Sequence, residues 1–115
     1  MNKVLLKFIH KLELVDHERN SWYLFSEGKG FILSSVCDFS FVGYDFIMAL
    51  NDLEIAKYEE LGASYLRELS SQINCSSPIS KKSTSKFKDR ALSESYSKKC
   101  LNAINRWEKK NNARA

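Results

Sequence analysis

The spacing of apolar residues changes at Asn51, and this change constrains the fold more than any other feature of the chain. Before it, aromatic and β-branched residues form short runs separated by polar or glycine-containing turns, which is typical of antiparallel strands. After it, apolar residues recur at steps of three and four, as on one face of a helix. Asn51 or Asp52 can cap that helix, and Glu54, three residues after Asn51, approximates a capping box. We therefore expect an α+β protein whose strands come first.

The first part of the chain predicts an antiparallel meander of three or four strands within residues 4–50. The runs 21–25 and 31–36 are rich in aromatic and β-branched residues, and the segment between them contains Gly28 and Gly30. Glycine adopts the positive φ angles that a tight hairpin turn requires. These two runs are therefore expected to pair as a hairpin.

Other parts of the expected sheet are less regular. After a turn at Cys37-Asp38, the run 39–50 is too apolar for an exposed sheet edge, and Gly43 within it suggests a bulge or a close backbone approach. Residues 16–20 are polar and are expected to form a turn. The period of residues 4–8 fits both a strand and a helix, so the sequence leaves that choice open.

Two helices are expected to pack on this sheet, near residues 52–73 and 93–110. Gly62 interrupts the first helix, and we interpret it as a close approach to the sheet, with a break as the alternative. Between the helices, residues 75–90 are serine-rich and basic, so we expect a mobile polar loop. The apolar stripe of the first helix includes Tyr58, Leu61, Tyr65, Leu66, Leu69 and Ile73, and that of the second includes Tyr96, Cys100, Leu101, Ile104 and Trp107.

Length and cysteine usage place the chain in a broad class. Its 115 residues, 43% of them hydrophobic, suit a single domain over 1–115 that folds around its own core. The chain contains no apolar run of membrane-spanning length, and Lys7 interrupts the apolar start. Cys37, Cys75 and Cys100 are odd in number and widely spaced, which favours free thiols in a reducing compartment. We expect a cytoplasmic protein that does not bind membranes.

Charge is divided unevenly along the chain. Residues 1–74 contain seven Lys/Arg and eleven Asp/Glu, a net charge of −4, whereas residues 75–115 contain eleven Lys/Arg and three Asp/Glu, a net charge of +8. A basic end on an acidic body can bind nucleic acid, fold back on the body or contact an acidic protein. The formal total of +4 hides this asymmetry.

The histidines, cysteines and carboxylates of the chain are not arranged in any pattern that predicts a catalytic or metal site. His10 and His17 are seven residues apart, and neither has a cysteine at metal-ligand spacing. Neither histidine stands in a recognisable relation to a nucleophile. The segment 28–30 lacks the spacing of a phosphate-binding loop and leads into a strand. We therefore predict no enzyme activity and no catalytic residues, metal or cofactor.

The arrangement of the chain resembles the small immunity proteins encoded beside bacterial contact-dependent growth-inhibition toxins. Such a resemblance implies a cytoplasmic protein that binds and neutralises one toxin domain, often a nuclease, by blocking its active site or substrate surface. It covers most of the chain and is carried by Trp22-Tyr-Leu-Phe25, Gly28-Lys-Gly-Phe31, Phe41-Val-Gly-Tyr44, Leu50-Asn-Asp-Leu-Glu54, Tyr58, Gly62, Tyr65-Leu66, and Lys88-Asp-Arg90 before Trp107.

Two surfaces are candidates for contact with a toxin, and the sequence leaves open which one is used, as it does the oligomeric state. A basic toxin domain would meet the acidic helix residues, and an acidic one the basic segment. The alternative function is nucleic-acid binding by the basic C-terminal third, with Phe87 stacking on a base. The acidic set is Glu54, Glu59, Glu60 and Glu68, and the basic set is Lys81, Lys82, Lys86, Lys88 and Arg90.

Overall fold

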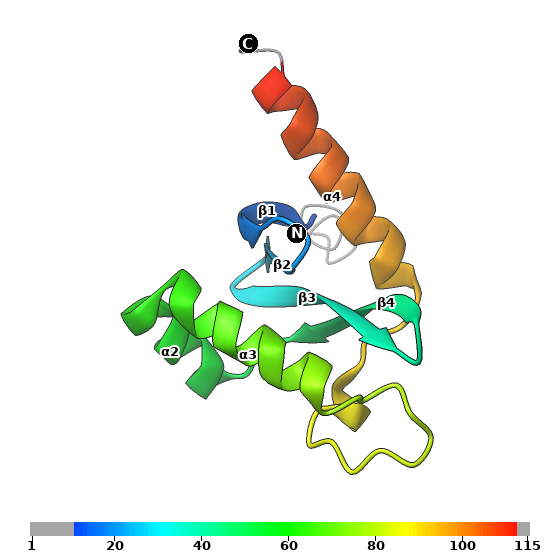
Figure 1. Ribbon diagram of the computed structural model, residues 1–115. Coiled ribbons are helices and arrows are strands. Elements are labelled where there is room, and N and C mark those ends of the chain that lie inside the picture. The colour runs from blue at the N-terminus through cyan, green and yellow to red at the C-terminus, as the bar shows by residue number, and fades with distance from the viewer. Residues whose placement is uncertain (1–10, 113–115) are drawn as a thin grey trace, which may run out of the picture.

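A computed structural model describes residues 11–112, which form a four-stranded antiparallel sheet with helices on both faces (Figure 1). The strand order β1-β2-β3-β4 is a meander, so the expected α+β architecture is confirmed. Residues 4–8, whose structure the sequence left open, lie outside the described residues. The elements are β1 (Glu13–Glu18), β2 (Trp22–Glu27), β3 (Gly30–Phe39), β4 (Val42–Ala49), α2 (Asp52–Leu61), α3 (Ala63–Cys75), the 3₁₀ turn η1 (Lys88–Arg90) and α4 (Ser95–Asn112).

The sheet separates two apolar clusters, because successive strand residues point to opposite faces. α3 packs on one face and α4 on the other (Figure 1). On the α3 face, Leu33 and Met48 meet Leu66, and on the α4 face, Ile32 and Ile47 meet Cys100. Within residues 11–112, no helix combines the length and the apolar composition that a membrane span needs.

The apolar face of α4 differs in two positions from the expected stripe, because both Leu101 and Trp107 are exposed. Cys100 and Ala103 are buried, and Tyr96 and Ile104 are half-buried against the same cluster. Leu101, however, is 57% exposed. Leu101 lies one residue after the buried Cys100, and on a helix this places it about 100° away from the buried face. Its assignment to the stripe was therefore wrong.

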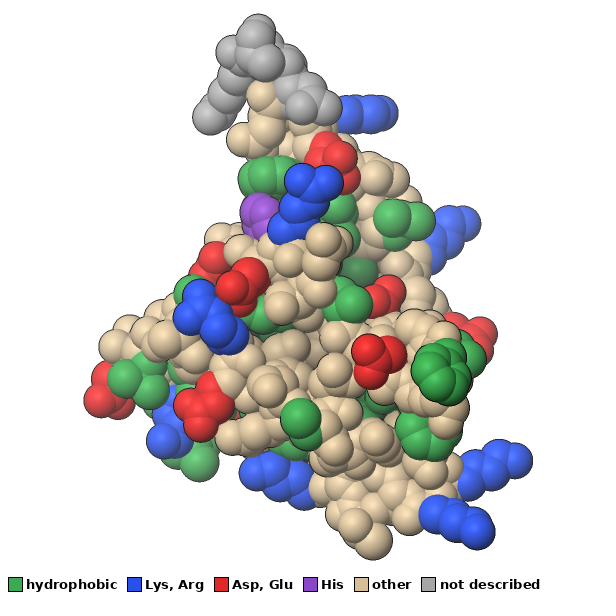
Figure 2. Space-filling model, in the orientation of Figure 1, with side chains coloured by type: hydrophobic (Ala, Val, Ile, Leu, Met, Phe, Trp, Pro, Cys, Tyr) green, Lys and Arg blue, Asp and Glu red, His purple; other side chains and the backbone are tan. Residues whose placement is uncertain are grey.

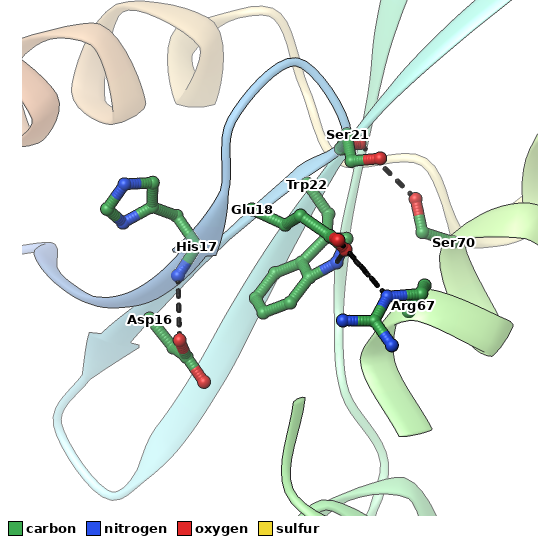
Figure 3. A network of polar contacts seen from close by, with 7 residues as sticks. All are labelled: Asp16, His17, Glu18, Ser21, Trp22, Arg67 and Ser70. Atoms are coloured by element: carbon green, nitrogen blue, oxygen red, sulfur yellow. Dashed lines mark hydrogen bonds and ion pairs between the residues drawn. The ribbon is translucent and has the colours of Figure 1, made fainter. Parts of the chain in front are cut away.

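Strand β1 is tied to the helices by polar contacts of its acidic residues (Figure 3). The Glu18 carboxylate accepts hydrogen bonds from Trp22 Nε1 and Arg67 Nε, both at 3.0 Å, and the Tyr58 hydroxyl donates to Asp16 Oδ2 at 3.1 Å. The expectation of a turn over 16–20 was wrong, because β1 continues to Glu18. The partners on α2 and α3 allow this acidic sequence to be a strand.

The β3–β4 hairpin turns later than expected. β3 runs through Cys37-Asp38 to Phe39, and the turn consists of Ser40 and Phe41, both with positive φ. Gly43 pairs with Asp38 in an unbroken register, so the expected bulge is absent there. β4 is nevertheless the last strand of the sheet, and its outer end exposes apolar side chains despite the apolar run.

Gly62 divides the expected helix 52–73 into α2 and α3. Its φ of 70° and ψ of −148° belong to a backbone region that is essentially restricted to glycine, and its N–H still donates to Tyr58 O. A Cβ built on Gly62 would have no atom within 4 Å, so the close-approach interpretation was wrong. The backbone conformation alone explains why glycine stands there.

The segment between α3 and η1 is held by serine side chains. Ser76 Oγ and Ser85 Oγ are 2.7 Å apart, and Ser83 Oγ donates to Ser76 O at 3.2 Å. Ser85 Oγ also accepts from the backbone N–H of Phe87, whose ring is only 2% exposed. The segment therefore has more anchors than its composition suggests, and its mobility stays a prediction for amide exchange.

Replacing Gly62 tests whether the α2–α3 break depends on backbone freedom. Gly62→Ala should reduce the free energy of unfolding by about 1–3 kcal/mol, because alanine is strained at this φ and ψ although its methyl group has room. Gly43→Ala is the matched control, since its Cβ would make ordinary contact 3.9 Å from Cys37 O in regular strand. Urea unfolding that finds Gly62→Ala as stable as the control would contradict this interpretation.

Candidate functional site

An open cleft of about 440 Å³ lies between α2, α3 and residues 86–90, and it brings together candidate residues of both charges. Glu54 and Glu68 from the acidic set line it, as do Lys86 and Arg90 from the basic set. We call it the mixed-charge cleft. The two surfaces that the sequence offered as alternatives therefore share a border in the folded chain.

The floor of the mixed-charge cleft is an ion pair between Glu54 and Arg90. Arg90 Nη1 and Nη2 donate to the two Glu54 carboxylate oxygens at 2.8 and 2.6 Å, and Nη2 also donates to Ala49 O at 2.8 Å. Glu54 Oε1 accepts in addition from the backbone N–H of Asn51 at 2.9 Å, which completes the expected capping box. One carboxylate therefore caps α2 and holds η1.

The same contacts set the ionisation of Glu54. Burial opposes its charge, but the hydrogen bonds from Arg90 and from the Asn51 backbone outweigh burial, so the pKa of Glu54 lies below its ordinary value. The hydrogen bond to Glu54 in turn raises the pKa of Arg90. Both groups are charged at neutral pH and bind each other, so neither is available to a partner as a free charge.

The remaining acidic candidates face solvent. Glu59 and Glu60 are exposed on α2, and Glu68 is exposed on α3 at the rim of the mixed-charge cleft. We call these three residues the acidic helix surface. In Figure 2, acidic and basic side chains are interspersed at the left, over α2 and α3, and further Lys and Arg side chains project at the lower right, over the loop after α3.

The basic candidates occupy different environments. Lys81 and Lys82 are exposed, and the Lys86 ammonium lies 5.2 Å from the centroid of the Phe87 ring. The Lys88 ammonium donates to Lys81 O at 2.8 Å and so closes the loop. Phe87 belongs to the α3-side core, so the expectation that it stacks on a nucleic-acid base was wrong.

Two exposed leucines beside the acidic helix surface were missed by the sequence analysis. Leu53 and Leu61 line the mixed-charge cleft and are 66% and 52% exposed, although Leu61 was expected in the buried stripe. Because the chain changes direction at Gly62, the side chains of α2 and α3 do not form one continuous apolar stripe. The alternative interpretation of Gly62 as a break in the helix was the signal that would have revealed this.

Of the cysteines, Cys37 and Cys100 are buried and Cys75 is exposed. Burial raises the pKa of Cys37 to about 11 and that of Cys100 to about 12, so neither thiol is a thiolate at neutral pH. The His17 ring stacks on Tyr23 and meets Trp107 edge-on. Among the described residues, which exclude His10, no three His, Cys, Asp or Glu side chains gather in a way that would hold a metal ion.

Comparison with models of known protein families, with curated proteins and with solved structures gives no match for this chain. The function proposed below therefore rests on the residues of this chain and the surfaces they form.

The Glu54–Arg90 pair predicts a specific pH dependence of stability. Folding lowers the pKa of the Glu54 carboxylate below its ordinary value of 4.5. Such a carboxylate stabilises the folded protein fully at pH values above 4.5, and this stabilisation is lost as the pH falls through the pKa of the folded state. Glu54→Gln should therefore cost about 2–3 kcal/mol at pH 7, because it leaves Arg90 without its counter-charge, and progressively less below pH 4.5.

Glu60→Gln, an exposed change on the same helix, is the control and should leave the free energy of unfolding nearly unchanged at both pH values. Chemical unfolding of the three proteins at pH 7 and pH 3 measures this. Equal destabilisation of Glu54→Gln at both pH values would show that the ion pair does not stabilise the fold.

Proposed function

We propose that the protein is a non-enzymatic immunity protein that binds a cognate bacterial toxin domain in the cytoplasm and blocks its active site or substrate surface. The observation that carries this proposal is the surface around the mixed-charge cleft, where Leu53 and Leu61 are exposed beside the acidic helix surface. Exposed apolar side chains rimmed by charge are typical of protein–protein contact sites.

The cleft is also suited to tight binding because it is formed before any partner arrives. The Glu54–Arg90 pair and the buried Phe87 ring fix residues 86–90 against α2 and α3. Binding then needs little ordering of this segment, which reduces the entropic cost of association. A protein whose task is to inhibit a toxin at low concentration benefits from such preorganisation.

The acidic helix surface favours a basic toxin domain, such as a nuclease, although the cleft beside it also exposes Lys57 and Lys86. Glu59, Glu60 and Glu68 are exposed, whereas Arg90 is neutralised by Glu54. A nuclease presents cations to its phosphate-rich substrate, and an acidic surface is complementary to them. The acidic helix surface would then occupy the region that the substrate uses.

Nucleic-acid binding is the second candidate, and the exposure of Lys81 and Lys82 is the observation that favours it. Of the groups that the sequence offered for this function, Phe87 is buried and the Arg90 guanidinium is engaged by Glu54 and Ala49 O. The remaining lysines would give salt-dependent binding without base recognition. This surface supports a nucleic-acid function less well than the cleft supports protein binding.

Co-expression tests the immunity function. The protein should restore growth to cells that express the toxin domain encoded next to its gene, and the two should co-purify one to one. Reversing Glu59 and Glu60 to Lys should slow association by about tenfold or more, because it removes electrostatic steering toward a basic partner. Added salt should likewise slow association more than it speeds dissociation.

Neutralising Lys81 and Lys82 to Gln, which lie outside the mixed-charge cleft, is the matched control and should leave binding to the toxin domain nearly unchanged. An acidic toxin would reverse the two results. Failure to rescue growth or to co-purify, combined with tight salt-dependent binding to RNA or DNA that the lysine variant loses, would instead favour the nucleic-acid function.

A further inference from the structure

The outer edge of β4 is paired along only part of its length. β4 is the last strand of the sheet, so one of its edges faces away from β3 (Figure 1). At the end of β4, Leu92 N donates to Ile47 O at 2.9 Å, and Met48 and Ala91 form an isolated antiparallel bridge. After Leu92 the chain turns into α4. It therefore begins a pairing along this edge that the described residues do not continue.

The unpaired part of the edge offers backbone donors and acceptors. Ile47 O and Ala49 O both bond to groups outside the sheet, so the odd-numbered residues of β4 direct their backbone groups away from β3. The unbroken register places the N–H and C=O of Gly43 and Asp45, and the N–H of Ile47, on this edge. No residue within 11–112 forms a hydrogen bond to these groups. We call the stretch from Gly43 to Ile47, about 17 Å of strand, the free β4 edge.

A cleft of about 300 Å³ lies along the free β4 edge. It is lined by residues 44–47 of β4, by Pro78 and Ile79 of the loop after α3, and by Leu92 and Glu94 before α4. The side chains of a strand alternate between the two faces of its sheet. A strand added here would therefore direct alternate side chains toward the loop after α3 and toward the start of α4.

We propose that the free β4 edge is a site of strand addition, at which an extended segment of the toxin domain pairs with β4, an inference that rests on the proposed function. The unpaired N–H and C=O groups of an edge match another extended chain, whereas the backbone groups of a helix are already bonded within the helix. In strand addition, main-chain hydrogen bonds provide affinity and alternate side chains provide specificity. The bridge between Met48 and Ala91 shows that this edge accepts an antiparallel chain.

Asp45 determines which charge the added segment should carry. Its side chain lies on the α4 side of the sheet, because Ile47, two residues later, belongs to the α4-side cluster. Asp45 and Glu94 are exposed in the cleft. The third charged group there, the Lys88 ammonium, already donates to Lys81 O at 2.8 Å. A residue directly opposite Asp45 shares its face, so Lys or Arg is favoured at that position, which a basic toxin domain can supply.

The same requirement argues against a second copy of this chain as the occupant. The edge strands of the sheet are β1 and β4, and neither contains Lys or Arg. A second β4 would add another Asp45 and no cation. β1 contains Glu13, Asp16 and Glu18, so it would set like charges beside Asp45, and like charges in an interface destabilise it.

Gly43→Pro tests the backbone pairing. Proline lacks the outward N–H, which no described residue uses, and its ring obstructs a chain that approaches the edge. The affinity for the toxin domain encoded beside the gene should fall by about tenfold or more, measured by titration calorimetry. Gly43→Ala is the matched control and should bind as the wild type does, because it keeps the N–H and its Cβ makes only ordinary contact, 3.9 Å from Cys37 O.

Asp45→Lys tests the charge and leaves the backbone of β4 intact. It places a cation opposite the cation expected on the added segment, so the affinity should fall by about three- to tenfold. Asp38→Lys is the control, because Asp38 is also exposed but lies on β3, one strand in from the edge. It should weaken binding less than Asp45→Lys does.

Amide exchange provides a signature of strand addition. On binding of the toxin domain, exchange should slow at Gly43, Asp45 and Ile47, whose N–H groups gain a partner, and change little at Tyr44 and Phe46, which pair with β3.

Wild-type affinity in both Gly43→Pro and Asp45→Lys would overturn strand addition and leave the immunity function standing. Absence of binding by the wild type would overturn both. Slow exchange at Gly43, Asp45 and Ile47 in the free protein, or a dimer in light scattering that Gly43→Pro dissociates, would show that this chain covers its own edge and would overturn the assignment to the toxin domain.

Discussion

The Glu54–Arg90 ion pair is the interaction on which the candidate site depends. It joins residues 36 positions apart, and it is bidentate, with both Glu54 oxygens engaged. Glu54 also belongs to the cap of α2, and Arg90 also reaches the end of β4 through Ala49 O. The N-terminus of a helix, the end of the sheet and the basic segment are therefore fixed by two side chains. Without this pair, residues 86–90 would retain Phe87 as their principal anchor to the core.

The fixed segment gives the proposed binding face its shape before any partner arrives. The mixed-charge cleft lies near the end of β4, where Arg90 Nη2 donates to Ala49 O. A standard interface buries about 800 Å² on each partner, which corresponds to a patch roughly 30 Å across. A partner of ordinary size could therefore contact the cleft and the acidic helix surface together.

Sequence patterns predicted most helices and strands correctly, because these elements depend mainly on interactions between residues close in sequence. The change of period at Asn51, the capping box of Asn51 and the amphipathic spacing of α4 each depend on residues close in sequence. The errors arose where contacts with residues distant in sequence determine the environment of a side chain. The contact of Glu54 with Arg90 leaves no local signal, so the sequence could not show that this carboxylate is already paired within the chain. Phe87 was assigned to a nucleic acid because its polar neighbours hide its burial. At Gly43 the expected bulge is absent, and at Gly62 the alternative of a break is confirmed while the close approach was wrong; only register and backbone angles decide these cases.

Hydrogen exchange of the protein with and without the toxin domain encoded beside its gene tests the central claim most directly, because it locates the interface without any substitution. The account predicts slower exchange on binding in α2 from Leu53 to Leu61, with little change around Lys81 and Lys82. Protection confined to residues 76–88, or none in the presence of excess toxin domain, would contradict the claim that this face binds and neutralises a toxin.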